Sequence, residues 1–265
     1  MYDLPALEAE LAGSLFAGKL HFAPVTGSTN SDAMAAAREG APHGSVWFAD
    51  EQLAGRGRGG HSWHSAAGEG LYVSVVLRLK IPRDKLLLLP LAAGLDAAEA
   101  VHAVSGLNVD LRWPNDLLIG PRKAGGILAE AKIESKIPPH AVVGIGINVH
   151  QQSFAPDLAT PATSLDLAAE RRVSRQPLLA ALLKSLQRET GAIEDQKAAA
   201  GILARVEAAS TWVRGRRVQV HGPQACAGVT DGLDEHGFLR VATAAGHVTV
   251  QTGGIREPGQ GPGID

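Results

Sequence analysis

A short run rich in glycine and arginine, Gly55–Gly60 (GRGRGG), offers the clearest chemistry in the sequence. Its alternating glycines let the backbone approach a ligand closely and present successive N–H groups to an anion. Arg56 and Arg58 add planar, permanently charged groups that match phosphate or carboxylate oxygens. The run lacks the Lys-Ser/Thr pair of a Walker A loop, and it does not open a helix as a dinucleotide fingerprint does. We therefore expect an anion-binding loop. An RGG-type RNA-binding segment or a flexible surface loop are the alternatives.

A second group of candidates follows a proline turn, Arg112-Trp113-Pro114-Asn115-Asp116. Because proline restricts the residue before it to an extended backbone, Asn115 and Asp116 are expected at the edge of a strand. Aspartate is a hard oxygen ligand suited to the Mg²⁺ that accompanies a nucleotide, although an ordinary Asx turn explains the pair equally well. Lys123 lies seven residues further on, directly before Ala124-Gly125-Gly126. There it can meet a ligand that approaches the backbone.

The segment 141–149 is expected to be a strand with one apolar face and one nearly bare face. Gly144, Gly146 and Asn148 share the bare face because side chains alternate along a strand. Glycine inside a strand costs stability and commonly marks the close approach of a ligand. A bulge or a tightly packed helix are the alternative interpretations.

A mixture of strands and helices must position these groups. The patterns predict strands at 20–25, 45–51, 71–79, 109–112, 117–119, 126–133 and 141–149, and helices at 4–16, 31–39, 86–104, 178–193 and 198–209. Short strands follow at 213–220, 227–233, 238–242 and 247–251. Because helices and strands do not alternate strictly, we expect an α+β fold, a mixed sheet with helices on one side. The expected divisions are a catalytic domain at 1–210, a small β module at 211–258 and a disordered tail at 259–265.

The composition excludes several classes of protein. The 265 residues carry a net charge of -2, which disfavours binding of nucleic acid over the whole surface. A single cysteine, Cys226, excludes an intramolecular disulfide and a CxxC metal site. No apolar run is long enough to span a bilayer, and the first residues are acidic rather than basic as in a signal peptide. We expect a soluble, cytoplasmic protein.

Taken in order, the motifs resemble those of biotin–protein ligases (biotin–[acetyl-CoA-carboxylase] ligases). The resemblance implies a class II synthetase-like catalytic domain followed by a small SH3-like β-barrel. Only 27 residues precede Ser28, so we expect the monofunctional type, without the N-terminal DNA-binding domain of some members. The motifs are Ser28-Thr29-Asn30, Gln52 with Gly55–Gly59, Trp63, Arg112–Asp116, Lys123 with Gly125–Leu128, and Gly146-Ile147-Asn148.

The resemblance further implies an activity and a set of site residues. ATP and Mg²⁺ would activate biotin to biotinyl-5′-AMP with release of pyrophosphate, and biotin would then pass to a lysine of a biotin carboxyl carrier protein of acetyl-CoA carboxylase or a related carboxylase. The enzyme would bind no DNA or membrane and could form a homodimer. A lipoate or octanoyl ligase or transferase of the same fold is the alternative. The implied roles are catalysis for Lys123, Arg56 and Arg58; biotin binding for Ser28, Thr29, Asn30, Gln52, Gly55, Arg56, Arg58, Lys123 and Gly126; ATP or adenylate binding for Arg56, Arg58, Trp63, Asn115, Asp116, Lys123 and Asn148; and metal binding for Asp116.

Overall fold

The structure is a computed structural model that describes residues 2–79, 85–134, 137–193 and 196–259. Most of the expected tail, residues 260–265, therefore lies outside the described residues. Within the parts of the chain that are described, no helix combines the length and apolar character that crossing a membrane requires.

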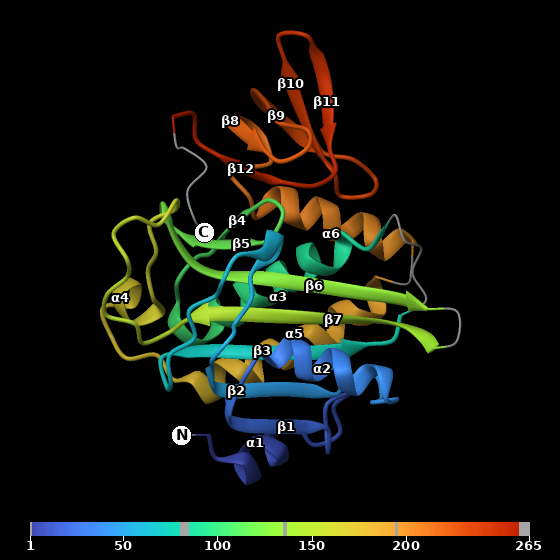
Figure 1. Ribbon diagram of the computed structural model, residues 1–265, viewed down its shortest axis with the longest axis vertical. Helices are drawn as coiled ribbons and strands as arrows, with labels where there is room; N and C mark the ends of the chain where they lie inside the picture. The colour runs from blue at the N-terminus through green and yellow to red at the C-terminus, as the bar shows by residue number, and fades with distance from the viewer. Residues whose placement is uncertain (1, 80–84, 135–136, 194–195, 260–265) are drawn as a thin grey trace.

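A seven-stranded mixed sheet forms the larger part of the molecule (Figure 1). The strand order is β1-β2-β3-β7-β6-β5-β4. Only β1 and β2 pair in parallel, and the other neighbours are antiparallel. The α+β mixed sheet predicted from the sequence is thus confirmed. The strands are β1 (Leu20–Thr26), β2 (Val46–Gln52), β3 (Gly70–Leu77), β4 (Asp110–Arg112), β5 (Asp116–Ile119), β6 (Arg122–Glu134) and β7 (Ile137–Asn148).

Helices pack mainly on one face of this sheet. Val75 of β3 and Val143 of β7 point into the main core, which also contains the buried faces of α3 (Leu88–Ser105) and α5 (Arg175–Ala192). Their neighbours along the same strands, Val76 and Val142, point to the opposite face, as alternation requires. There they meet α2 (Thr29–Arg38), which is the exception to the expected one-sided packing. α6 (Gln196–Ala208) packs against α3.

The most informative differences from the predicted elements lie at the first helix and in the segment after β7. The helix expected at 4–16 ends early as α1 (Leu4–Glu10), because turns follow and Gly13 adopts a positive φ of 75° that a right-handed helix cannot contain. The short helix α4 (Leu165–Ala169) was not predicted. Its start is a standard one, since Ser164 accepts a hydrogen bond from the backbone of Leu167.

The C-terminal part forms a separate five-stranded antiparallel sheet in the order β11-β10-β9-β8-β12. Figure 1 shows this C-terminal module above α6 and the β4–β5 edge of the large sheet. The buried indole N–H of Trp113 donates to the carbonyl of Gly237 in the module at 3.0 Å. The division at residue 211 stays a prediction, although the second sheet begins close to it. The strands are β8 (Arg214–His221), β9 (Cys226–Leu233), β10 (Leu239–Thr243), β11 (Gly246–Val250) and β12 (Gly254–Arg256), of which the last was not predicted.

Candidate functional site

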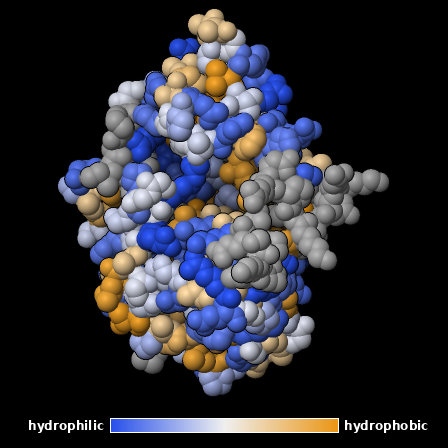
Figure 2. Space-filling model, turned by 45° about the vertical axis from the view of Figure 1, so that its right-hand side comes forward, coloured by the Kyte–Doolittle hydropathy of each residue, from blue (hydrophilic) through white to orange (hydrophobic). Residues whose placement is uncertain are grey.

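A cavity of about 480 Å³ opens where the large sheet, the loop after β2 and the C-terminal module meet. Figure 2 shows the surface hollowed just below the module, with hydrophilic residues around the opening. Eleven of the thirteen residues predicted for the site line this cavity, and Gly55 and Asn148 do not. The eleven are Ser28, Thr29, Asn30, Gln52, Arg56, Arg58, Trp63, Asn115, Asp116, Lys123 and Gly126.

One end of the cavity, which we call the neutral end, is a connected set of uncharged polar groups. The backbone N–H and the hydroxyl of Thr29 both donate to Gln52 Oε1, at 2.9 and 3.0 Å. The amide of Gln52 in turn donates to Ser65 Oγ at 2.8 Å. The hydroxyl of Ser74 lies 2.8 Å from Thr29 Oγ1 and 2.7 Å from Asn30 Oδ1. Since Thr29, Asn30 and Ser74 are all buried, this network is fixed in place and suits an uncharged group with both donors and acceptors.

The bare face of β7 explains how this end is packed. A Cβ on Gly144 would lie 2.1 Å from Asn30 Oδ1, and one on Gly146 would lie 2.7 Å from Trp63 Nε1. The sequence predicted that a ligand approaches these glycines, and this stays a prediction. The atoms that approach them are the side chains of Asn30 and Trp63, which themselves line the cavity.

Two predicted contacts are not supported by the geometry. The side chain of Asn148 is buried away from the cavity, where its Nδ2 donates to the carbonyl of Thr163 at 3.0 Å. Gly55 begins the glycine-arginine loop, and a Cβ on it would lie 2.4 Å from the carbonyl oxygen of Trp63. Asn148 therefore braces the loop after β7, and Gly55 allows the glycine-arginine loop to fold back on itself.

The opposite end, which we call the cationic end, is organised around one carboxylate. Lys123 Nζ lies 2.8 Å from Asp116 Oδ1, and Arg112 contacts Asp116 Oδ2 through Nε at 3.0 Å and Nη2 at 2.6 Å. Burial by itself would raise the pKa of Asp116, but Lys123 and Arg112 outweigh it and hold that pKa below its ordinary value. Asp116 therefore stays ionised, and the trio carries one net positive charge at the cavity wall.

This geometry does not fit the predicted role of Asp116 as a metal ligand. Both of its oxygens are already engaged by cations, which occupy the positions that a metal ion would need. Among the described residues, no group of three or more His, Cys, Asp or Glu side chains could hold a metal ion. Any Mg²⁺ at this site would arrive with its nucleotide as part of the substrate.

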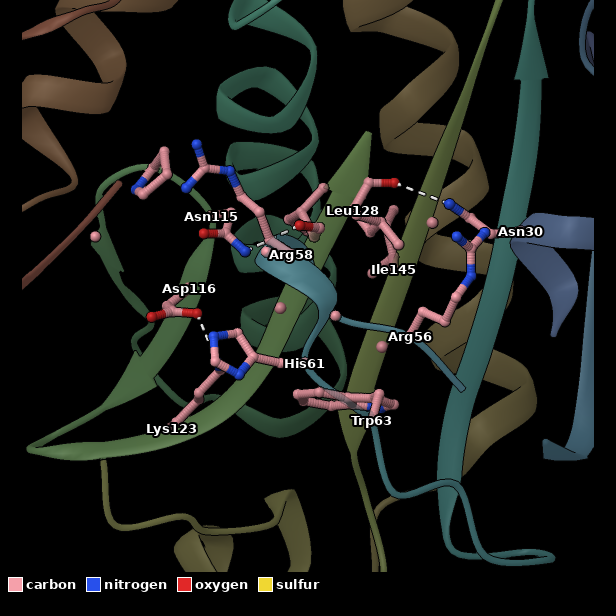
Figure 3. A pocket seen from close by; sticks show the side chains of 18 of the residues that line it. Asn30, Arg56, Arg58, His61, Trp63, Asn115, Asp116, Lys123, Leu128 and Ile145 are labelled. Atoms are coloured by element: carbon pink, nitrogen blue, oxygen red, sulfur yellow. Dashed lines mark hydrogen bonds and ion pairs between the residues drawn. The ribbon is translucent and has the colours of Figure 1, made fainter. Parts of the chain in front are cut away.

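The two arginines of the glycine-arginine loop point in opposite directions (Figure 3). Arg56 reaches toward the neutral end and pairs with Glu130, with Nη2 2.8 Å from Oε2 and Nη1 3.2 Å from Oε1. Arg58 reaches the C-terminal module, where Nη2 donates to Thr252 Oγ1 at 2.7 Å and Nη1 donates to the carbonyl of Gly253. The segment expected to lack regular structure contains one short 3₁₀ turn, Arg58–Gly60.

The sequence interpretation missed several residues around the cavity. Ser74 carried a signal, because it is a small polar residue within an otherwise apolar strand. Glu130 and Thr252 carried none, since their partners Asn30, Arg56 and Arg58 lie far away in the sequence. The module also contributes His221, Gly222, Pro223, Thr252, Gly253, Gly254, Ile255 and Arg256 to the cavity wall.

Comparison with known proteins agrees with this arrangement. The profile of the Biotin/lipoate A/B protein ligase family matches residues 22–148. The bifunctional ligase/repressor BirA of Bacillus spizizenii is 39% identical over 166 residues, and the chain spans only 51% of that protein's length. A biotin protein ligase from Aquifex aeolicus, solved in complex with biotin and ATP, superimposes with a TM-score of 0.76 at 27% identity, over 90% of this chain and 98% of that one.

One curated relative is similar over nearly its whole length. The biotin–[acetyl-CoA-carboxylase] ligase of Mycobacterium tuberculosis is 35% identical over 237 residues, which cover 87% of this chain and 85% of that protein. Because similarity at this level extends over most of both proteins, the chain belongs to the biotin protein ligase family.

Proposed function

We propose that the chain is an enzyme that joins biotin to a lysine of an acceptor protein in two steps driven by ATP. The observation that carries the proposal is the pairing of the neutral end and the cationic end in one cavity. Biotin has the same two-part character, since an uncharged ureido ring lies at one end of the molecule and a carboxylate at the other.

The ureido ring fits the neutral end. It offers N–H donors and a carbonyl acceptor, which need partners when they leave water. Thr29, Asn30 and Gln52 supply hydroxyl and amide groups whose positions are already fixed by hydrogen bonds. Binding there would orient biotin with its carboxylate toward Lys123.

The first step brings one anion against another. A carboxylate oxygen of biotin attacks the α-phosphorus of ATP, the bond to the β-phosphate bridging oxygen breaks, and pyrophosphate leaves. Catalysis of this reaction depends on positioning and on fixed positive charge. Lys123, held by Asp116, supplies that charge next to the reacting carboxylate and phosphate, and Arg58 extends it toward the module. The Mg²⁺ bound to ATP enters as part of the substrate.

The second step transfers biotin to the acceptor. The neutral amine of the acceptor lysine attacks the carbonyl carbon of the mixed anhydride, AMP leaves, and an amide bond forms. Two curated relatives carry the name biotin–[acetyl-CoA-carboxylase] ligase, so we propose the biotin carboxyl carrier domain of that enzyme as the acceptor. A cytoplasmic location and a homodimer stay predictions.

The test is incubation of the chain with biotin, ATP and Mg²⁺, with and without a biotin carboxyl carrier domain. We expect biotinyl-5′-AMP and pyrophosphate without the carrier, and one added biotinyl group on it by mass spectrometry when it is present. A carrier with its target lysine replaced by arginine is the control. Transfer of lipoate or octanoate without any transfer of biotin would establish the alternative and reject this proposal.

A further inference from the structure

We propose that Thr252 of the C-terminal module is a positioning residue that holds Arg58 in place and thereby slows the escape of the adenylate. The inference rests on the proposed function. It assigns part of the site's control over its reactive intermediate to a turn outside the large sheet, between β11 and β12.

The contacts of Arg58 leave its charge available. Its partners are the hydroxyl of Thr252 and the carbonyl of Gly253, which are both uncharged. Arg56, two residues earlier, instead faces the carboxylate of Glu130 at 2.8 Å. Arg58 is therefore held in one orientation without being neutralised, so it can still attract a phosphate.

The turn that holds Arg58 is itself fixed within the module. Gln224 Oε1 accepts hydrogen bonds from the backbone of Gln251 at 3.0 Å and of Thr252 at 3.4 Å. Gly253 adopts a φ of 122°, and a Cβ there would lie 2.1 Å from the carbonyl of His221. The close packing of backbone against backbone leaves this turn little freedom to move.

The module is in turn attached to the large sheet by contacts that do not involve Arg58. Trp113 donates to Gly237 at 3.0 Å. The backbone N–H and the hydroxyl of Thr211 donate to Asp110, at 2.8 and 2.6 Å. Thr252 is therefore at a defined place relative to the cationic end even before Arg58 reaches it.

An Arg58 side chain that is already ordered before the adenylate forms lowers the entropic cost of binding the adenylate. An arginine side chain loses considerable rotamer freedom when it is immobilised, and a group that is ordered before the ligand arrives has already met that cost. Without Thr252, Arg58 keeps one contact of two and samples more orientations. The adenylate would then dissociate faster and react with lysines of unrelated proteins.

The experiment compares T252V, T252S and the control T249V in the full chain. Valine removes the hydroxyl with little change of shape, serine restores it, and Thr249 lies exposed on β11 of the same module. Biotinyl-5′-AMP is formed in each variant, and its dissociation is followed by a chase with unlabelled biotin. We expect T252V to raise the dissociation rate roughly three- to tenfold, which is the size of one hydrogen bond of ordinary net strength, because the carbonyl of Gly253 still holds Arg58. T252S and T249V should stay within about twofold of the unmodified chain.

Two further readouts separate positioning from a general structural effect. The double variant R58A/T252V should release the adenylate no faster than R58A alone, because Thr252 acts through Arg58. Biotin affinity without ATP should be unchanged in T252V, because the neutral end contains no residue of the module. Thr252 is exposed, so the substitution should preserve folding. Hydrogen exchange in the loop 55–63 should become faster, because Arg58 loses one of its two contacts with the module.

An unchanged dissociation rate in T252V, or equal increments from T252V with and without Arg58, would overturn the inference. Failure of the proposed function would look different, because the unmodified chain would then make no biotinyl adenylate at all.

Discussion

The two ends of the cavity are built on different physical terms. At the neutral end, the uncharged groups of Thr29, Gln52 and Ser74 come from the large sheet and from α2 on its face, and they satisfy each other through short hydrogen bonds. At the cationic end, Lys123, Asp116 and Arg112 form an ionic cluster, and a second sheet brings Thr252 to Arg58. An uncharged ring is recognised by the geometry of donors and acceptors, whereas a developing negative charge needs net positive charge that no partner has cancelled.

The glycine-arginine loop shows the same contrast within three residues. Arg56 and Arg58 are identical in type, but only Arg56 has a carboxylate partner, Glu130. Glu130 also accepts a hydrogen bond from Asn30 Nδ2 at 3.0 Å, so Arg56 is tied to the neutral end. The partner, rather than the residue type, decides whether an arginine serves as structure or as available charge.

Loss of Lys123 should give the largest effect and should be confined to the cationic end. Replacement of Lys123 by glutamine removes the charge nearest the reacting groups, so we expect adenylate formation to fall by about a thousandfold, as for other fixed electrostatic groups. Biotin binding without ATP should weaken much less, because the neutral end still holds the ureido ring. The rate of pyrophosphate release measures adenylate formation, and calorimetry measures biotin binding. The exposed Lys184, replaced in the same way, is the control. A K123Q chain within tenfold of normal activity would contradict this assignment.

The hydrogen-bond network of the neutral end should be disrupted when a methyl group is added to β7 at Gly144. In G144A the new Cβ would lie only 2.1 Å from Asn30 Oδ1, which is far inside van der Waals contact. Asn30 must therefore move, and its hydrogen bond with Ser74 is lost. We expect the Kd for biotin to rise roughly 10- to 100-fold, the cost of one or two buried hydrogen bonds, with little change in the KM for ATP.

The matched control for this substitution is G201A. Gly201 lies in α6, and a Cβ there meets nothing within 4 Å. Because alanine favours a helix over glycine, G201A should bind biotin normally and be slightly more stable. Equal weakening of biotin and ATP binding by G144A would show that the two ends are not separable.

Arg56 and Arg58 provide the sharpest comparison with a smaller effect. R58A should raise the dissociation rate of the adenylate by roughly tenfold, consistent with loss of an interaction to a charged group, and should increase labelling of non-acceptor lysines. R56A should instead raise the Kd for biotin, because Glu130 loses its cation and no longer holds Asn30 Nδ2 in a fixed place. Each variant is the control for the other. If both affect the same step to the same extent, the distinction between paired and available charge fails.

Asp96 lies outside both ends and should alter stability alone. This carboxyl is 2% exposed and accepts a hydrogen bond from Ser185 Oγ at 2.7 Å, and burial raises its pKa to about 8. The folded state therefore favours the protonated form, so the stability that it contributes is present below pH 4 and is lost as the pH rises toward 8.

In D96N this loss is removed, so the difference in unfolding free energy between D96N and the unmodified chain should grow between pH 4 and 8. A growth of several kcal/mol is expected, since one pKa unit corresponds to about 1.4 kcal/mol. Denaturant unfolding at several pH values measures it, and D157N at an exposed position is the control. Adenylate dissociation should not change. A difference that is flat across this range would contradict the buried, protonated state.

Local patterns predicted the elements, and the family resemblance supplied most of the candidate site residues, eleven of which line the cavity. Alternation in the segment 141–149 showed which face of β7 is bare, but not that Asn30 and Trp63 lie against it. The residue type of Asp116, a hard oxygen ligand, suggested a metal site. The β5–β6 hairpin instead brings Lys123 beside Leu118, and thus onto the carboxylate.

The remaining residues depend on contacts that no local pattern encodes. Thr252 stands 194 positions from Arg58 and follows an unremarkable strand, so its role is visible only in three dimensions. Asn148 followed the motif by resemblance, yet its side chain turns toward Thr163 instead of the cavity.

The place of Arg58 at the junction of the two sheets has a consequence for speed as well as fidelity. In the proposed reaction, the acceptor lysine would enter and AMP would leave through the opening that Arg58 and the Thr252 turn border. A stronger hold on this border would keep the intermediate longer but would also delay each turnover. A contact made of one guanidinium, one hydroxyl and one carbonyl is weak enough to open on every cycle, so evolution can adjust the balance between throughput and stray labelling at a single side chain.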